Sequence, residues 1–124
     1  MEHVNNYKDL EVYKLSRQLS KEIFEISKMY PKEEMYSLTD QMRRSSRSVG
    51  AQIAEAWAKR KYEKHFISKL TDADGEQLET QHWLEIAFDC LYITEAIANR
   101  LNTKYTYRGK MLGSMINKSE SFCA

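Results

Sequence analysis

The chain has 124 residues, which is enough for one domain with a substantial core and no need of disulfides or metal ions. With only 4 Gly and 1 Pro, its composition argues against architectures built from strands and tight turns, and it predicts a single all-α domain over residues 1–124. The formal net charge of +1 by itself neither indicates nor excludes nucleic acid as a partner.

The sequence has no segment typical of membrane insertion or export. No stretch is apolar over the roughly 18 residues that a membrane-spanning helix requires, and the first residues contain neither a basic leader nor an apolar run before small residues. We therefore expect a cytoplasmic protein that has no membrane partner. The two cysteines, Cys90 and Cys123, lie far apart and form no ligand cluster, so we expect no disulfide.

The first predicted helix covers residues 9–30. It opens at Asp9, a residue type that caps helix N-termini, and Pro31 stops the pattern. Its apolar face is formed by Val12, Leu15, Leu19, Ile23, Ile26 and Tyr30.

The second predicted helix covers residues 38–59. Ser37 and Asp40 have the spacing of a capping box in front of it. One face carries Leu38, Met42, Ser45, Val49, Ile53 and Ala56. A short basic turn near residues 60–62 follows this helix and separates it from the next.

Two further helices are predicted over residues 63–89 and 94–119. The core stripe of the third carries Phe66, Leu70, Ala73, Leu84, Phe88 and Leu91. The stripe of the fourth carries Ile97, Leu101, Tyr105, Leu112 and Met115. Four amphipathic helices joined by short loops predict an up-down-up-down antiparallel four-helix bundle.

Two of these helices have a second nonpolar face. Opposite the core stripe of the second helix lie Arg43, Arg47, Gly50, Ala51, Ala54 and Ala58, with Trp57 beside them. Opposite the stripe of the third lie Trp83, Ile86 and Cys90. Alanine on an outer surface can reflect helix propensity alone. Together with the third helix, however, these faces predict an interface between copies of the chain, formed by Gly50, Ala54, Trp57, Trp83 and Ile86.

Charges are segregated along the chain. Residues 41–70 hold 8 basic and 2 acidic side chains, whereas residues 71–100 hold 1 and 7. If the second and third helices form a hairpin about residue 61, then Arg43, Arg44 and Arg47 lie level with Glu76 and Glu79. Ion pairs between these groups, in one chain or between neighbours, are one expectation, and phosphate binding by the arginines is the other.

The basic turn is the stronger candidate for nucleic-acid binding. Its cations are Lys59, Arg60, Lys61 and Lys64, and only Glu63 is near enough in sequence to compete for them. We expect binding that does not depend on base sequence, with Tyr62 available to stack on a base.

The sequence offers no positive case for catalysis. Glu79 and His82 have the Glu-x-x-His spacing of di-iron bundles, but the second motif that such sites need is missing. We find no Gly-rich phosphate loop, nucleophile elbow or Cys–His arrangement. We therefore expect a protein that is not an enzyme and has neither a metal site nor a cofactor.

Three stretches carry a resemblance to a known family: DLEVYKLSRQLSKEIF, MYPKEEMYSLTDQMRRSSRSVGAQIAEA and ADGEQLETQHWLEIAFDCLYI. They resemble the four-helix bundle proteins of the 23S rRNA intervening-sequence family over roughly residues 7–120. The most specific part is Tyr36-Ser37-Leu38, Gln41, Arg43-Arg44, Ser48-Val49 and Ile53-Ala54-Glu55. Gln52 and Ala56 stand where Asn and Gly are usual in that family, and Ser37 and Leu91 where Gly is often found.

Members of this family are similar to the accessory variability determinant of diversity-generating retroelements. That protein is a homopentamer that binds nucleic acid and a reverse transcriptase. The resemblance thus implies a homopentamer, an RNA or DNA partner, and a reverse transcriptase or other protein partner. Our prediction is a non-enzymatic homo-oligomeric scaffold associated with nucleic acid or with a protein partner. The alternative is a protein-interaction module with no nucleic-acid role.

Overall fold

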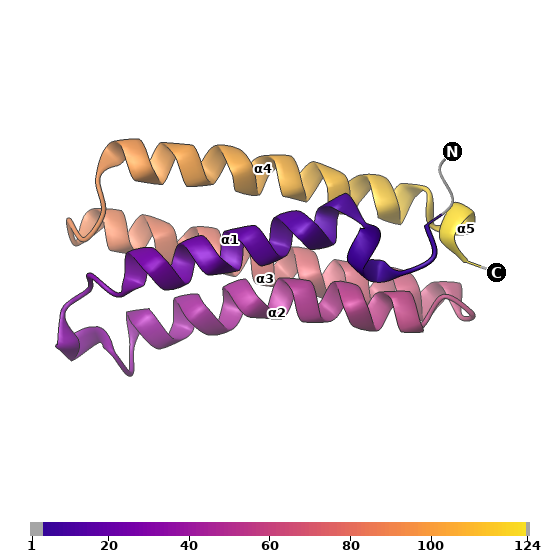
Figure 1. Cartoon of the computed structure of the whole chain (residues 1–124), viewed down its shortest axis with the longest axis horizontal. Helices are drawn as coiled ribbons and strands as arrows, with labels where there is room; N and C mark the ends of the chain where they lie inside the picture. The colour runs from indigo at the N-terminus through magenta and orange to yellow at the C-terminus, as the bar shows by residue number, and fades with distance from the viewer. Residues whose placement is uncertain (1–3, 124) are drawn as a thin grey trace.

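The computed structural model describes residues 4–123, which form four long helices that alternate in direction (Figure 1). These are α1 (Glu11–Ser27), α2 (Leu38–Ala58), α3 (Glu63–Asp89) and α4 (Glu95–Asn117). Three short elements accompany them: η1 (Tyr7–Asp9), η2 (Lys32–Glu34) and α5 (Ser119–Phe122). Consecutive long helices pack against each other, so the predicted antiparallel four-helix bundle is confirmed. Among the described residues, no helix combines the length and apolar character needed to cross a membrane.

The first helix is shorter than predicted at both ends. Asp9 does not cap it, because Asp9 is the last residue of η1, where the Asn6 side chain accepts a 2.9 Å hydrogen bond from the Lys8 amide. Leu10 occupies the N-cap position of α1 without a side-chain cap. The helix ends at Ser27, before Pro31 is reached, and Pro31 occupies the N-cap position of η2.

The predicted capping box in front of α2 is not formed. Ser37 does occupy the N-cap position, but its side chain makes no cap hydrogen bond. The Leu38 amide instead donates to Oε1 of Glu34 at 3.4 Å. Asp40 points to the next turn, where its carboxylate lies 3.7 Å from Arg44.

The third helix ends in a Schellman motif, which removes Leu91 from the core. The Leu91 amide donates to the Phe88 carbonyl and the Tyr92 amide to the Ala87 carbonyl, both at 2.9 Å. Leu91 takes the left-handed position of this motif, with φ 62°, and is 86% exposed. Its predicted place on the core stripe was wrong, because α3 stops at Asp89 before the stripe reaches it.

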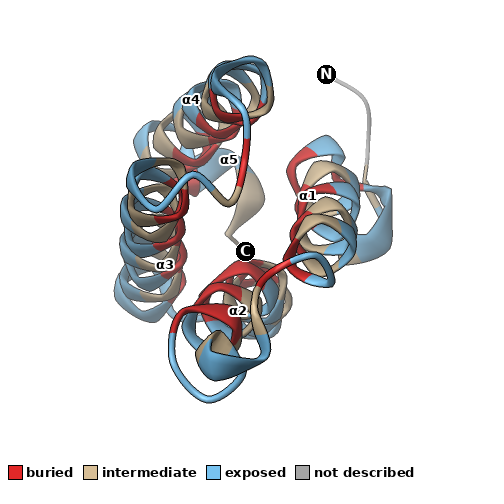
Figure 2. Cartoon of the chain, turned by 90° about the vertical axis from the view of Figure 1, so that its left-hand side faces the viewer, coloured by how far each residue is buried: buried red, intermediate tan, exposed pale blue. Residues whose placement is uncertain are grey.

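The core consists of two apolar clusters that follow one another along the bundle. Figure 2, which looks along the bundle, shows the buried residues on the faces of the long helices that point toward its centre. One cluster lies at the level of Leu19, Met42 and Leu84, and the other at the level of Val12, Ile53 and Leu70. Buried polar groups occupy the helix positions between the clusters, including Gln77 and Arg108. All six predicted stripe residues of α2 are buried, as expected for a face that meets the core.

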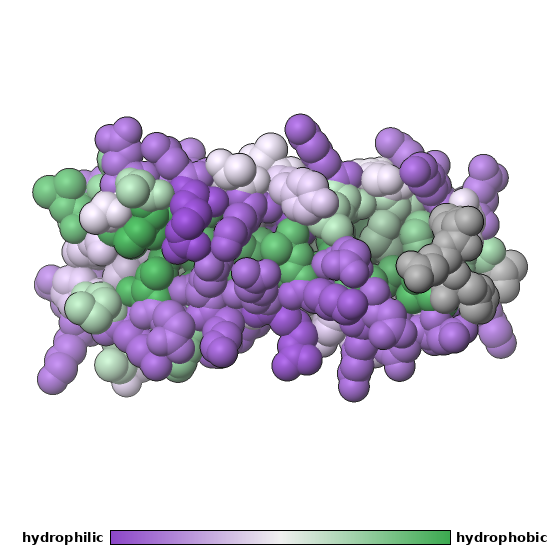
Figure 3. All heavy atoms as spheres, turned by 45° about the horizontal axis from the view of Figure 1, so that its top comes forward, coloured by the Kyte–Doolittle hydropathy of each residue, from purple (hydrophilic) through white to green (hydrophobic). Residues whose placement is uncertain are grey.

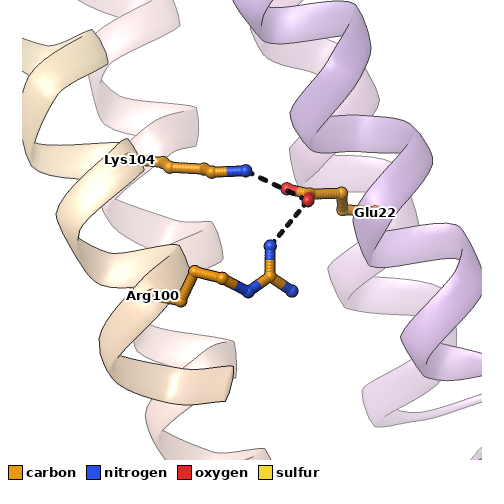
Figure 4. A network of polar contacts seen from close by, with 3 residues as sticks. All are labelled: Glu22, Arg100 and Lys104. Atoms are coloured by element: carbon orange, nitrogen blue, oxygen red, sulfur yellow. Dashed lines mark hydrogen bonds and ion pairs between the residues drawn. The ribbon is translucent and has the colours of Figure 1, made fainter. Parts of the chain in front are cut away.

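A polar network joins α1 to α4 (Figure 4). Oε1 of Glu22 accepts from Arg100 at 2.7 Å and from Lys104 at 3.2 Å. Burial by itself raises the pKa of Glu22, but the hydrogen bonds from the two cations outweigh this and hold that pKa below its ordinary value of 4.5. The first and last long helices are thus connected by charge as well as by the core.

Candidate nucleic-acid interface

A cleft of about 540 Å³ lies between α1 and α2 and is lined by basic side chains. Its lining residues are Arg17, Gln18, Ser20, Lys21, Phe24 and Arg47. The lining contains three cations and no carboxylate, and the Arg47 guanidinium lies 5.5 Å from the centroid of the Phe24 ring. We refer to Arg17, Lys21, Phe24 and Arg47 as the basic cleft.

Of the two other arginines on this part of α2, only Arg43 contacts a residue of the cleft. Arg43 is half-buried, its Nε donates to Oγ of Ser27 at 2.8 Å, and its guanidinium lies 4.6 Å from the centroid of Phe24. Arg43 therefore fixes the packing of α2 against α1. Arg44 points elsewhere and pairs with Asp40 along the same helix.

The expected ion pairs between these arginines and α3 are not formed within the chain. The register was right, because the hydroxyls of Ser45 on α2 and Thr80 on α3 lie 2.7 Å apart. The expected neighbour was wrong, because Arg43 and Arg47 lie on the flank of α2 that faces Phe24 of α1 and not on the flank that faces α3. Their charges are therefore not neutralised by Glu76 or Glu79 of the same chain.

The acidic surface of α3 remains only weakly compensated. Lys69 pairs with Glu55 of α2 at 2.8 Å, and this is the ion pair that bridges the two helices among the described residues. Burial, followed by the neighbouring charges of Glu79 and Asp72, raises the pKa of Glu76. A carboxylate held next to an arginine would show the opposite shift.

The basic turn lies at the other end of α2 and contains three exposed lysines. Lys59, Lys61 and Lys64 make no hydrogen bond or ion pair with any described side chain. Arg60 differs, because its guanidinium stacks 3.6 Å from the centroid of Trp57 and its Nε donates to the Trp57 carbonyl at 2.9 Å.

Two further features define the surroundings of the turn. The rings of Tyr62 and His65 lie 5.7 Å apart, and both residues are exposed. Glu63, the acid expected to compete for the lysines, instead accepts a 2.7 Å hydrogen bond from Ser119. This contact also brings Lys118 to the same end of the bundle.

Arg17 and Lys21 are site candidates that our reading of the sequence missed. They belong to a series on α1, with Lys14 before them and Lys28 after, at spacings of three, four and seven residues. Residues at these spacings lie on one helix face, so the series could have indicated a basic surface on α1. Lys14 and Lys28 pair with Glu11 and Glu25, whereas no ion pair involves Arg17 or Lys21 within the described residues.

The residues predicted to form an interface between copies are mostly half-buried within their own chain. A Cβ at Gly50 would lie 3.8 Å from Ser16 and from Tyr13 on α1. Trp57 packs on one core cluster, and Trp83 and Ile86 pack on the other. Nε1 of Trp83 also donates to Glu79 at 3.1 Å. Ala54 is half-buried as well. The assignment of these five residues to an interface between copies stays a prediction.

An apolar groove of about 370 Å³ runs between the start of α1 and the second half of α4. Its lining residues are Leu10, Glu11, Val12, Tyr107, Lys110, Met111, Ser114 and Met115. Figure 3 shows apolar side chains between rows of hydrophilic ones on this side of the molecule. Within residues 4–123, no three His, Cys, Asp or Glu side chains gather as metal ligands, and both cysteines are free.

Comparison with known proteins gives a family and a related structure. The model of the 23S rRNA-intervening sequence protein family matches residues 8–114. A solved structure of a protein with unknown function, from the S23 ribosomal protein family of Bacteroides thetaiotaomicron, is 32% identical and superposes with a TM-score of 0.77. That match covers 86% of this chain and 95% of the other. No curated protein matches. Since the family model spans most of its length, the chain belongs to the 23S rRNA-intervening sequence protein family.

Proposed function

We propose that this protein is a non-enzymatic, homo-oligomeric bundle that binds the phosphates of single-stranded RNA or DNA through the basic cleft. The observation that carries this proposal is the cleft itself, in which Arg17, Lys21 and Arg47 meet without a carboxylate in the lining. A phosphate gains most from a cation whose charge is not already paired, because binding then releases counterions without breaking an ion pair.

The same reasoning changes the relative weight of the two basic clusters. We expected the turn to dominate because the mid-helix arginines would pair with α3. Since Arg43 and Arg47 face α1 instead, that reason no longer holds for Arg47. The turn serves as a second contact, about 20 Å further along α2 at 1.5 Å per residue. A flexible strand can span this distance, and Tyr62 at the turn is exposed for stacking on a base.

Self-association is the second part of the proposal. A closed ring needs two different faces on each copy, because every copy meets one neighbour on each side. We assign one face to the α1–α4 groove and the other to the half-buried residues Trp83 and Ile86 of α3. Five copies, as the family resemblance implies, would place five basic clefts on one assembly and raise its avidity for a long strand.

A reverse transcriptase partner, and an origin in an rRNA insertion or a retroelement, rest on that resemblance alone.

The binding site can be tested with two variants that each remove three cations. We would measure fluorescence anisotropy with single-stranded RNA and DNA of about 20 nucleotides, across a salt series. The cleft variant is Arg17→Ala/Lys21→Ala/Arg47→Ala, and the matched turn variant is Lys59→Ala/Lys61→Ala/Lys64→Ala. We expect the cleft variant to lose more affinity and to lower the salt slope by about 2, at roughly 0.7 per phosphate contact.

Circular dichroism and light scattering would first establish that both variants remain folded and assembled. A loss confined to the turn variant would show that the turn, not the cleft, holds the strand. No binding by the wild type at low salt would favour the alternative, a protein-interaction module, for which the opposite end of the bundle offers a surface.

A further inference from the structure

The end of the bundle opposite the basic turn exposes large apolar side chains. Met29, Met35 and Tyr36 on the α1–α2 connection are 83%, 49% and 91% exposed, and Leu91 on the α3–α4 connection is 86% exposed. Figure 3 shows apolar spheres at this left-hand end of the molecule. We refer to these four residues as the apolar end. Clustered apolar side chains on a surface mark a site of interaction, whereas isolated ones need no explanation.

The two connections that carry these residues are held together. The hydroxyl of Tyr92 donates to Oε2 of Glu34 at 2.9 Å, and the rings of Tyr30 and Tyr92 lie 5.3 Å apart. The hydrogen bond to Glu34, with burial as a lesser cause, raises the pKa of Tyr92 to about 12. The loops therefore form one supported surface and not two independent segments.

Leu91 is placed on this surface at the expense of bundle stability. It has φ 62°, the left-handed conformation that glycine adopts freely and a branched side chain does not. Its side chain is almost entirely exposed, so packing within the chain does not compensate for the strain. The Schellman motif requires the left-handed backbone at this position, but glycine would adopt it without strain. A strained residue whose side chain the fold does not use favours a functional role for that side chain.

The surroundings of the apolar end are acidic. Residues 29–37 and 89–95 contain four carboxylates, Glu33, Glu34, Asp89 and Glu95, against one cation, Lys32. Glu33, Asp89 and Glu95 are exposed and form no ion pair within the described residues. Methionines add adaptability, because their unbranched side chains repack against differently shaped partners.

We infer that the apolar end is a docking surface for a basic amphipathic helix of a partner protein. The apolar face of such a helix would cover Met29, Met35, Tyr36 and Leu91, and its Lys or Arg residues would meet the surrounding carboxylates. A second copy of the chain fits less well. Two apolar ends would bring like charges together, and the basic turn exposes only one large hydrophobic side chain, that of Tyr62.

The inference can be tested with a synthetic peptide. The probe is a fluorescent helix of about 20 residues with Leu on one face and Lys on the other, and its control carries Glu in place of each Lys. The test variant is Tyr36→Ser/Leu91→Ser. The matched control variant is Tyr62→Ser/Leu78→Ser, which removes the same two residue types from exposed positions elsewhere.

We expect the wild type and the control variant to bind the basic peptide equally, within about twofold. The test variant should bind the basic peptide at least about tenfold more weakly, because it loses apolar contacts at the centre of the proposed interface. The acidic peptide should bind at least about tenfold more weakly than the basic one. Equal binding of both peptides, equal losses in both variants, or no binding of the basic peptide would each overturn the inference. So would an assembly that the test variant alone dissociates, because a second copy would then cover this end.

Discussion

Arg108 donates a hydrogen bond from Nε to Oε1 of Gln77 at 2.7 Å, and both side chains are buried in the middle of the bundle. Burial, opposed by the neighbouring Tyr105 and Asp74, lowers the pKa of Arg108 to about 10. The guanidinium also lies 4.8 Å from the centroid of Tyr105. This pair therefore fixes α3 against α4 at the level where the two apolar clusters separate.

Gly109 is the residue that lets Gln77 reach Arg108. A Cβ at position 109 would lie 2.5 Å from Nε2 of Gln77. We predict that Gly109→Ala lowers the free energy of unfolding by at least about 1 kcal/mol, because displacing the amide leaves buried polar groups unpaired. Thermal unfolding followed by circular dichroism would measure this loss.

Gly113→Ala is the matched control on the same helix. Nothing lies within 4 Å of a Cβ at position 113, so this substitution should raise stability by up to about 1 kcal/mol through helix propensity. A Gly109→Ala protein as stable as Gly113→Ala would show that Gln77 moves without loss and that the contact has no structural weight.

Leu91→Gly should stabilise the bundle. Glycine relieves the left-handed strain of about 1–2 kcal/mol, and part of this gain is offset by the greater entropy of the unfolded chain. We expect a net gain of about 0.5–1 kcal/mol in urea unfolding. Leu78→Gly, on an exposed part of helix α3, should lose about 1 kcal/mol. A loss at both positions would mean that Leu91 contributes packing that its exposure does not suggest.

The sequence was sufficient for the architecture because helical periodicity identifies the face that meets the core. It also placed the arginines of residues 43–47 level with residues 76–79, and the 2.7 Å contact between Ser45 and Thr80 agrees with that level to within a helical turn. Two antiparallel helices joined by a short turn have little freedom of register. The sequence did not identify which neighbouring helix covers a flank. Arg43 and Arg47 of α2 were therefore expected to face α3, whereas they contact Phe24 of α1. Helical periodicity tells how far a residue lies from the face that meets the core. Which neighbouring helix lies on that flank depends on the handedness of the bundle, which periodicity does not give.

Arg108 illustrates a second limit. It lies between Tyr105 and Leu112 at core spacing, but arginine is a residue type that is almost never fully buried without a partner. Only the position of Gln77 on another helix makes its burial possible, and a single sequence does not reveal that pairing. The basic cleft shows the same limit in part: the series on α1 could have indicated Arg17 and Lys21, but a single sequence does not reveal that Arg47 of α2 lies beside them.

The network around Glu22 should make stability depend on pH in the acid range. The folded-state pKa of Glu22 lies below its ordinary value of 4.5. The ionised Glu22 therefore stabilises the folded state fully above its ordinary pKa of 4.5, and this stabilisation is lost as the pH falls through the folded-state pKa. We predict that Glu22→Gln lowers the free energy of unfolding by about 1 kcal/mol near pH 7, and that the difference from wild type shrinks at about pH 3.

Glu25→Gln is the control for this effect. Glu25 pairs with Lys28 at 3.4 Å, but both side chains are about half exposed and lie three residues apart on one helix. Its loss should cost no more than about 0.5 kcal/mol. If both variants lose the same amount, the connection between α1 and α4 adds nothing beyond an ordinary surface pair.

The proposed ring can be tested by mixing two variants that each damage one face. Met111→Glu places a charge in the α1–α4 groove, and Trp83→Glu places one on the α3 face. We expect light scattering to give an oligomer for the wild type and a monomer of 14.6 kDa for either variant alone. An equimolar mixture should give a dimer, because the intact α3 face of the Met111 variant fits the intact groove of the Trp83 variant and no further joint can form. Circular dichroism would confirm that both variants fold. A wild type that is monomeric at micromolar concentration would contradict self-association, and a mixture that stays monomeric would show that the two residues do not belong to complementary faces.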